Sequence, residues 1–400
     1  MILELLIALL CGVTAGTITG LTPGIHINLV AAILLSLALS QYFSLLTPIF
    51  VMIFIASMSI THIFIDFIPS IYLGAPDDNS CLSVMPGHEL LLDGKGHEAV
   101  FYTLIGCLSA VLISILITPI LTISLPLVYP FLQRLMALIL IWAVIFLIYR
   151  EPNSKIWALI IFFLSGFLGI ATLNLPLKEP LLPLLSGLFG CSTLIYSISQ
   201  KTKIPPQKLE KIEINKKELL KPLLSSSIIS PLCSFLPGLG SSQAAIIGSE
   251  ILGKLNRKQF LFLLGSASII TMSLSFTTLY IINKSRTGSA ALISQIITLT
   301  PFNLFLIFLS IIISAIISFF ITIYISKHLS SKISQINYSL VSKTILLIIT
   351  ICVIVFSGLL GLLILIISTI VGLLAITVSI RRGHLMGCLV LPTILFYLPL

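Results

Sequence analysis

The sequence carries very little charge. Only 9% of its 400 residues are Asp, Glu, Lys or Arg, whereas 58% are apolar, and the mean hydropathy is +1.19. A water-soluble domain needs a far more charged surface, while apolar runs of roughly 17 to 25 residues suit helices that span a bilayer. Runs such as 345–367 are continuous rather than alternating, which excludes a membrane β-barrel. The sequence therefore predicts an all-α polytopic, multi-pass protein of the cell membrane.

Motifs for catalysis and cofactor binding are also missing. The seven cysteines form no CxxC pair, and no GxSxG, Walker A, dinucleotide-binding or HExxH pattern occurs. The polar stretch 74–98 holds several acidic residues and histidines, but their spacing matches no metal motif. We therefore expect no enzyme, no cofactor and no metal. Without a nucleotide site, any transport has to be downhill or coupled to an ion gradient.

Basic residues give a net charge of +9 but do not predict a nucleic-acid partner. They lie at the ends of apolar runs, where they report membrane topology. The first ten residues lack a basic region and a small-residue cleavage site, so they do not predict a signal peptide.

A sequence motif present in two copies organises the chain. GLTPGIHINLVA at 20–31 is matched by SFLPGLGSSQAA at 234–245, and Pro237 follows Pro23 by 214 residues. The same offset aligns the tetrad MSIT at 58–61 with MSLS at 272–275. We interpret 1–199 and 222–400 as two transmembrane repeats, joined by a cytoplasmic linker at 200–221 that contains seven lysines.

Each copy predicts an interrupted helix, because proline removes a helical donor and glycine tolerates unusual backbone geometry. Exposed backbone at membrane depth is tolerated only beside protein or a water-filled cavity, and broken helices build substrate sites in transporters. The alternative is a proline-kinked span that binds nothing. We expect each repeat to hold one re-entrant hairpin and about five transmembrane helices, at 45–71, 99–125, 132–149, 156–174, 181–199, 259–282, 300–326, 343–360, 362–380 and 385–400.

The distribution of Lys and Arg tests this layout. If each broken segment enters and leaves on one side, 18 of the 22 basic residues share a side, which is then cytoplasmic. Five crossings separate the two hairpins, and because five is odd the second repeat is inverted relative to the first. Inverted repeats are typical of alternating access. If the broken segments cross fully, the repeats are parallel instead.

The breaks supply the candidate substrate-binding residues. Hydroxyls, an amide and free backbone N–H groups at a helix N-terminus favour an anionic group. The predicted site comprises Thr22, Pro23, Gly24, His26 and Asn28 in the first copy, and Pro237, Gly238, Gly240, Ser241, Ser242 and Gln243 in the second.

Ionisable residues inside a membrane are costly and therefore informative. His62 and Asp66 share one helix face at i and i+4, so they are candidates for ion coupling. The alternative is a structural pair that fixes helix packing. The hydroxyls of Ser59, Thr61, Ser273 and Ser275 could face the same cavity, or bond to carbonyls of their own helix.

The motifs LTPGIH and LPGLGSSQAA resemble the PG-containing repeats of the TctA family, the large permease subunit of tripartite tricarboxylate transporters. A basic cluster follows the second motif, at Lys254, Arg257 and Lys258, and the stretch with APDD, MPGHE and LLDGKGHEA resembles a further family segment. The chain is most similar to the stand-alone, archaeal-type branch. It departs from the bacterial permeases at His26, where they usually have glycine.

The resemblance implies a secondary permease for a small organic anion, a carboxylate, coupled to an H+ or Na+ gradient. The implied partners are the substrate, the coupling ion, the lipid bilayer, and a small membrane subunit or a solute-binding protein. A translocase of polyprenyl phosphate or another lipid phosphate is the main alternative. An intramembrane enzyme using His62 and Asp66, and a scaffold without transport activity, are the others.

Overall fold

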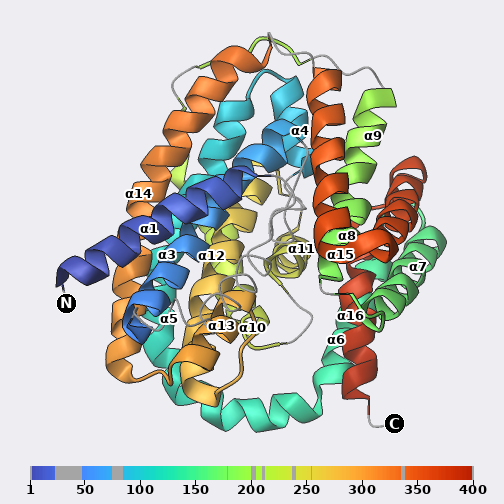
Figure 1. Ribbon diagram of the computed structural model, residues 1–400. Helices are drawn as coiled ribbons and strands as arrows, with labels where there is room; N and C mark the ends of the chain where they lie inside the picture. Colours follow the sequence, from blue (N-terminus) through green and yellow to red (C-terminus); the bar gives the residue numbers. More distant parts are fainter. Residues whose placement is uncertain are drawn as a thin grey trace.

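The computed structural model describes residues 2–22, 47–73, 84–177, 179–199, 204–209, 212–236, 240–253, 255–334 and 338–398 (Figure 1). These residues form helices and connecting turns, with no strand among them. Seven of the described helices are long and apolar enough to cross a membrane. The expected all-α, multi-pass membrane architecture is therefore confirmed.

The helices follow one another along the whole chain. Their bounds are α1 Ile2–Leu21, α3 Pro48–Ile68, α4 Val84–Leu92, α5 Gly96–Arg134, α6 Met136–Tyr149, α7 Lys155–Leu173, α8 Leu181–Leu185, α9 Ser192–Ser199, α10 Lys216–Cys233, α11 Ser241–Leu252, α12 Arg257–Ile282, α13 Gly288–Ile296, α14 Pro301–Ile333, α15 Tyr338–Thr377 and α16 Gly387–Tyr397. Two π-helical turns, η2 Pro69–Leu73 and η4 Ser186–Cys191, and the 3-10 turn η5 Arg382–Met386 complete the described secondary structure.

Local sequence signals set several of these boundaries. A threonine followed by proline begins both α3 and α14, and the hydroxyls of Thr47 and Thr300 accept the N–H groups of Phe50 and Asn303 at 3.2 Å. Proline at the first helical position costs no hydrogen bond, and the threonine oxygen satisfies a free donor. α10 begins at Lys216, six residues before the expected second repeat, because the Asn215 side chain caps it.

The offset between the two motif copies also relates helices in the two halves of the chain. The 214-residue offset places α1 on α10, and it places α3 within α12. α1 packs along α3 just as α10 packs along α12. α3 and α12 are also the most buried of the long apolar helices, so the two equivalent helices form the centre of the molecule.

In this centre α3 runs parallel to α14, and α5 runs parallel to α12. Thr61 on α3 accepts a hydrogen bond from Ser318 on α14 at 2.8 Å, and further along both helices Tyr72 reaches Ser330 at 2.5 Å. α5 and α12 are parallel in the same way, because Cys107 approaches the carbonyl of Gly265 and Thr118 the hydroxyl of Thr277.

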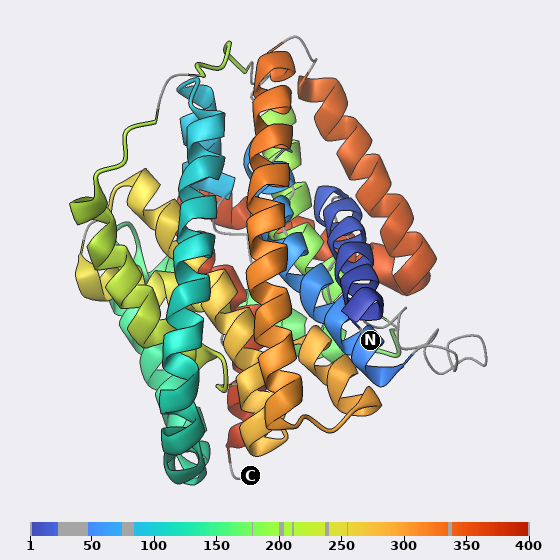
Figure 2. The same cartoon turned by 90° about the vertical axis from the view of Figure 1, so that its left-hand side faces the viewer.

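The two pairs run in opposite directions. His97, at the start of α5, contacts Ser326 near the end of α14 at 2.9 Å. Tyr129, near the end of α5, instead binds Arg286, just after α12. α5 and α14 therefore lie antiparallel (Figure 2). It follows that α3 and α12, the equivalent helices of the two repeats, point in opposite directions.

Helices beyond this centre form a second group. α7, α8, α9, α15 and α16 lie together, on the right of Figure 1, around two small cores that contain Phe189 and Val353. α6 joins the groups, and α11 lies between them (Figure 1).

Three expected spans differ in form from the observed helices. The span expected at 99–125 belongs to α5, which continues to Arg134 through Pro119, Pro126 and Pro130. Prolines are tolerated in membrane helices where neighbours satisfy the freed groups. The spans expected at 343–360 and 362–380 form α15, whose two parts meet at Gly358, with φ 68° and ψ −165°.

Glycines allow the central helices to touch. A Cβ on Gly265 of α12 would lie 2.2 Å from the carbonyl oxygen of Thr103 on α5, and Gly106 makes the reciprocal approach to Phe262. On α1, Gly12, Gly16 and Gly20 face α3 in the same manner. Small residues at such spacing let membrane helices approach closely.

We expect Gly265→Val to destabilise the fold by about 1–3 kcal/mol, because the valine side chain forces α5 and α12 apart. The matched control is Ala171→Val, which enlarges an exposed side chain on α7. Thermal unfolding in detergent measures both. An equal melting temperature for the two variants would contradict the close packing of α5 and α12.

Candidate functional site

The second break is described on both sides of its proline and glycine. α10 ends at Cys233 and α11 begins at Ser241, while Pro237 and Gly238 lie outside the described residues. The N–H of Gly240 donates to Oε1 of Gln243 at 2.8 Å, which fixes the start of α11. Ser241, Ser242 and Gln243 are all buried. A polar helix N-terminus thus lies inside the protein.

Of the first break, the described residues include only Thr22. Its hydroxyl donates to the carbonyl of Ile18 at 2.7 Å, at the end of α1. Pro23, Gly24, His26 and Asn28 lie outside the described residues, so the predicted meeting of the two breaks stays a prediction.

His62 and Asp66 are both buried on α3. Nδ1 of His62 lies 3.0 Å from the hydroxyl of Thr19, so this histidine links α3 to α1. This contact agrees with a packing role for His62, and it adds Thr19 as a partner that the sequence did not single out.

The repeated hydroxyls mostly serve helix packing. Ser59 contacts Ser289 at 2.5 Å, Thr61 accepts from Ser318, and Ser275 contacts Thr287 at 3.0 Å. Ser273 differs from them, because in the described part of the chain its buried hydroxyl has no hydrogen-bond partner.

Unpartnered hydroxyls collect on the helices beside the second break. Within the described ranges, Ser225 and Ser230 on α10 and Thr271, Ser273 and Thr278 on α12 are buried without a partner. α10 and α12 pack against each other, and Ser230 lies only four residues before Ser234, where the second motif begins. A buried polar group without a partner costs about 1–3 kcal/mol, so these positions favour a wet or ligand-binding region.

A cavity of about 740 Å³ lies beside the other end of α11. Its wall combines the end of α6, the end of α11, the start of α12 and η5. The charged and titratable side chains of the wall are Arg150, Glu250, Arg257, Arg381, Arg382 and His384. Four guanidinium groups therefore face one carboxylate.

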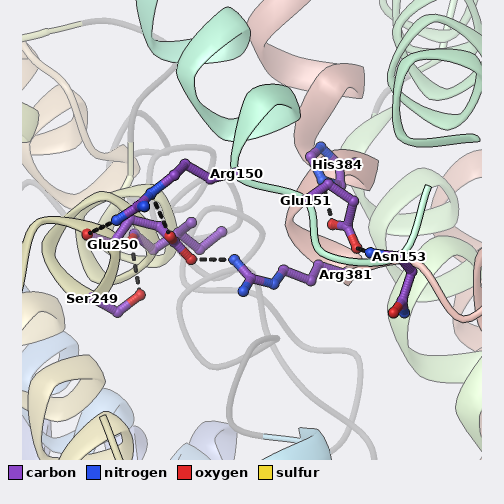
Figure 3. A network of polar contacts seen from close by, with 8 residues as sticks. Arg150, Glu151, Asn153, Ser249, Glu250, Arg381 and His384 are labelled. Carbon is purple, nitrogen blue, oxygen red and sulfur yellow. Dashed lines mark hydrogen bonds and ion pairs between the residues drawn. The ribbon is translucent and has the colours of Figure 1, made fainter. Parts of the chain in front are cut away.

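Glu250 holds two of these arginines (Figure 3). Nε of Arg150 lies 3.2 Å from Oε2 of Glu250, and Nη2 of Arg150 donates to the backbone carbonyl of Glu250 at 2.9 Å. Arg381 pairs with the other carboxylate oxygen. The Glu250 side chain is only 13% exposed, whereas the two arginines are 45% and 47% exposed. One shielded carboxylate is thus shared by two partly solvated guanidinium groups.

A second pair lies beside this one (Figure 3). Nε2 of His384 lies 2.9 Å from Oε2 of Glu151, and both side chains are buried. Burial lowers the pKa of His384, the hydrogen bond and charge of Glu151 oppose this shift, and the charge of Arg381 adds to it. With a lowered pKa, His384 is neutral at pH 7 and donates to Glu151.

The remaining arginines of the wall are also held in place. Arg382 is buried and donates to the hydroxyl of Thr193 at 2.6 Å. Arg257 pairs with Asp93 at 2.9 Å and with Glu89 at 3.6 Å. These acidic residues come from the polar stretch 74–98, which therefore binds the start of α12. A second pocket, of about 20 Å³, shares His384 with the cavity and reaches Gln243.

Sequence reasoning missed most of this network. It assigned the basic residues at helix ends to topology alone, and Glu151 and His384 are 233 residues apart in the chain. The available signal was the scarcity of acidic residues, only thirteen in the chain, two of which are Glu151 and Glu250.

The lowered pKa of His384 predicts a dependence of stability on pH. Because the unfolded state binds more protons, this contribution is fully present above the unfolded pKa of 6.5 and declines as pH falls. We expect the melting temperature to fall between pH 7 and pH 5, and this fall to be smaller in His384→Gln. His328→Gln, at an exposed histidine, is the control. Identical pH profiles for wild type and His384→Gln would contradict the assignment.

A comparison with protein-family models identifies one family. The profile of the tripartite tricarboxylate transporter TctA family matches residues 6–387. An uncharacterized protein of Methanocaldococcus jannaschii is 31% identical over 403 residues, which cover 98% of this chain and 99% of that protein. No solved structure matches the chain. The TctA family is a family of membrane transporters, and the chain belongs to it.

Proposed function

We propose that this protein is a secondary permease for a small organic anion, a carboxylate, that works by alternating access coupled to an H+ or Na+ gradient. Membership of a transporter family supports the general class. The observation that carries the proposal is the opposite direction of the equivalent helices α3 and α12 at the centre of the fold.

Opposite directions are what inverted repeats require. α1 lies parallel to α3, because Gly12 approaches Ser57 and Gly20 approaches Ile65. Thr47, at the start of α3, donates to Glu4 near the start of α1 at 2.5 Å, so Thr22 and Thr47 lie at opposite ends of this helix pair. Glu4 and Thr47, which lie before and after the first break in the chain, therefore lie on one side of the molecule. On this ground we propose that the first broken segment is a hairpin.

The second broken segment forms a hairpin that opens toward the other side. The Gln259 side chain, at the start of α12, donates to the carbonyl of Glu218 near the start of α10. The twelve residues of α11 measure about 18 Å, which is shorter than the roughly 30 Å hydrocarbon core. We infer that α10 and α11 enter and leave on the side rich in Lys and Arg.

The proposed substrate site lies between the two breaks. Its second half is the start of α11, with Ser241, Ser242 and Gln243. α11 packs against α10 and α12, the helices that carry the unpartnered hydroxyls. A helix N-terminus with such groups favours a carboxylate. The first half, from Thr22 through Pro23, Gly24, His26 and Asn28, is assigned from the sequence alone.

Gln243→Glu tests this site, because a carboxylate placed there repels an anion. We expect uptake of labelled succinate or citrate into proteoliposomes to fall at least about tenfold. The matched control is Gln259→Glu, since Gln259 caps α12 with the same geometry, its Oε1 accepting the N–H of Asn256 at 3.0 Å. Equal uptake by the two variants would remove Gln243 from the site. Uptake of no carboxylate, together with flipping of a lipid phosphate, would favour a lipid translocase instead.

Coupling is the role proposed for Asp66, with His62 beside it on α3. We expect Asp66→Asn to abolish uptake driven by an ion gradient while substrate exchange persists, because an amide cannot gain or lose the coupling charge. Asp93→Asn, at an exposed aspartate paired with Arg257, is the control. An unchanged gradient dependence in Asp66→Asn would return Asp66 to a structural role.

A further inference from the structure

The arginine-lined cavity lies at the end of α11 that is opposite to Ser241, and it has no place in the mechanism so far. It lies where α11 and α12 meet α6 and η5. α6 belongs to the first half of the chain, and the other three elements belong to the second half. Its arginines all belong to the side rich in Lys and Arg. Its volume of about 740 Å³ falls in the range of roughly 300–1,000 Å³ that is typical of small-molecule sites.

The cavity already holds one carboxylate, that of Glu250. Each oxygen of this carboxylate serves a different arginine, Oε2 with Arg150 and Oε1 with Arg381. Neither guanidinium therefore has a carboxylate of its own, although guanidinium groups form their strongest pairs with two parallel hydrogen bonds to one carboxylate. Both arginines remain nearly half exposed and can be reached from the cavity.

We propose that this cavity is a second anion-binding site, selective for small dianions, in which Glu250 is a tethered competitor of the ligand. A dicarboxylate supplies one carboxylate to Arg150 and another to Arg381, so it replaces the single shared carboxylate of Glu250. A monocarboxylate replaces the single carboxylate of Glu250 with another single carboxylate, so the number of ion pairs with Arg150 and Arg381 does not increase. The number of carboxylates on the ligand therefore decides whether it can displace Glu250.

Displacing Glu250 also has a mechanical effect. In the described structure, Glu250 ties the end of α11 to α6 through Arg150 and to the start of η5 through Arg381. A bound dianion releases α11 from Arg381 and leaves Arg150 attached to it only through the backbone carbonyl of Glu250. Because α11 begins at the proposed substrate site, binding at the cavity loosens the hairpin that carries Gln243. This inference deepens the proposed permease function and rests on it for its physiological meaning.

The charged and titratable side chains around Glu250 come from the end of α6, the start of α12 and the region of η5. Arg150 belongs to the end of α6, Arg381, Arg382 and His384 to η5 and the residue before it, and Arg257 to α12. Arg257 is already paired with Asp93 and Glu89. His384 is already paired with Glu151. Arg150 and Arg381 are therefore the groups that a ligand gains by replacing Glu250.

The test measures binding to the purified full-length protein, without any ion gradient. Isothermal titration at constant ionic strength compares succinate, citrate, acetate, inorganic phosphate and a short-chain polyprenyl phosphate. We expect succinate to bind at least about tenfold more tightly than acetate. Glu250→Gln should tighten succinate binding at least about fivefold, because succinate then no longer displaces a carboxylate that is paired with two partly exposed arginines.

Arg150→Gln and Arg381→Gln should each weaken succinate binding at least about tenfold. Arg134→Gln, at an exposed arginine assigned to the opposite side, should leave it unchanged. The Glu250→Gln result is decisive, because a misfolded variant cannot gain affinity. Unchanged affinity in Glu250→Gln, equal binding of acetate and succinate, or binding of the polyprenyl phosphate alone would each overturn the proposal.

The two proposals fail in different ways. Succinate binding that responds to Glu250→Gln, without uptake into proteoliposomes, would leave the cavity site standing and refute the permease. Uptake that Gln243→Glu abolishes, with succinate affinity unaffected by Glu250→Gln, would refute the cavity site and leave the permease standing.

Discussion

The fold depends on one constraint of the bilayer: every backbone N–H and C=O group within it has to be hydrogen-bonded inside the protein. Continuous helices meet this constraint, and the apolar spans of the described chain are helical. A helix may break only where other protein or water satisfies the freed groups. The second break follows this rule, because Phe235 and Leu236 before it and Ser241 after it are buried in the protein.

The same constraint explains why the centre contains glycine and serine. Apolar side chains gain little by leaving lipid for protein, so close packing and hydrogen bonds between helices must hold them together. The approaches of Gly106 and Gly265 bring the backbones of α5 and α12 into contact. Along α14, Ser318 and Ser326 bond to α3, η2 and α5.

Salt bridges, unlike the glycine and serine contacts, lie away from the centre of the helix bundle. Five of the described acidic side chains, those of Glu89, Asp93, Glu98, Glu151 and Glu250, form salt bridges near helix ends on the side rich in Lys and Arg. Glu98 binds Lys258 at 2.5 Å, Glu151 binds His384, and Glu250 binds two arginines. These pairs join segments distant in sequence, and the one at Glu250 connects the hairpin α10–α11 to the second helix group.

Much of the architecture could be predicted from sequence because its causes are local. The apolar runs predicted an all-α membrane protein, and Thr22-Pro23 predicted the end of α1. The tetrad MSIT and its copy MSLS predicted that α3 and α12 are equivalent helices. The network at Glu250 depends on tertiary contacts that no local pattern encodes. Arg382 meets Thr193, and Glu151 meets His384, only because η5 folds back onto the first half of the chain. The length of α5 was also not predicted. Its three prolines favour a helix end, but α5 continues past them because it packs against neighbouring helices.

The central claim is that the two repeats are inverted, and cysteine labelling tests it most directly. Thr47 and Asn256 are exposed residues that cap the equivalent helices α3 and α12. In a variant without native cysteines, Thr47→Cys and Asn256→Cys would be exposed in intact cells to a maleimide that cannot cross the membrane. Inverted repeats predict labelling of Thr47→Cys from outside, and of Asn256→Cys only after the membrane is opened. Labelling of both positions from the same side would contradict the inversion, and with it alternating access around the two breaks.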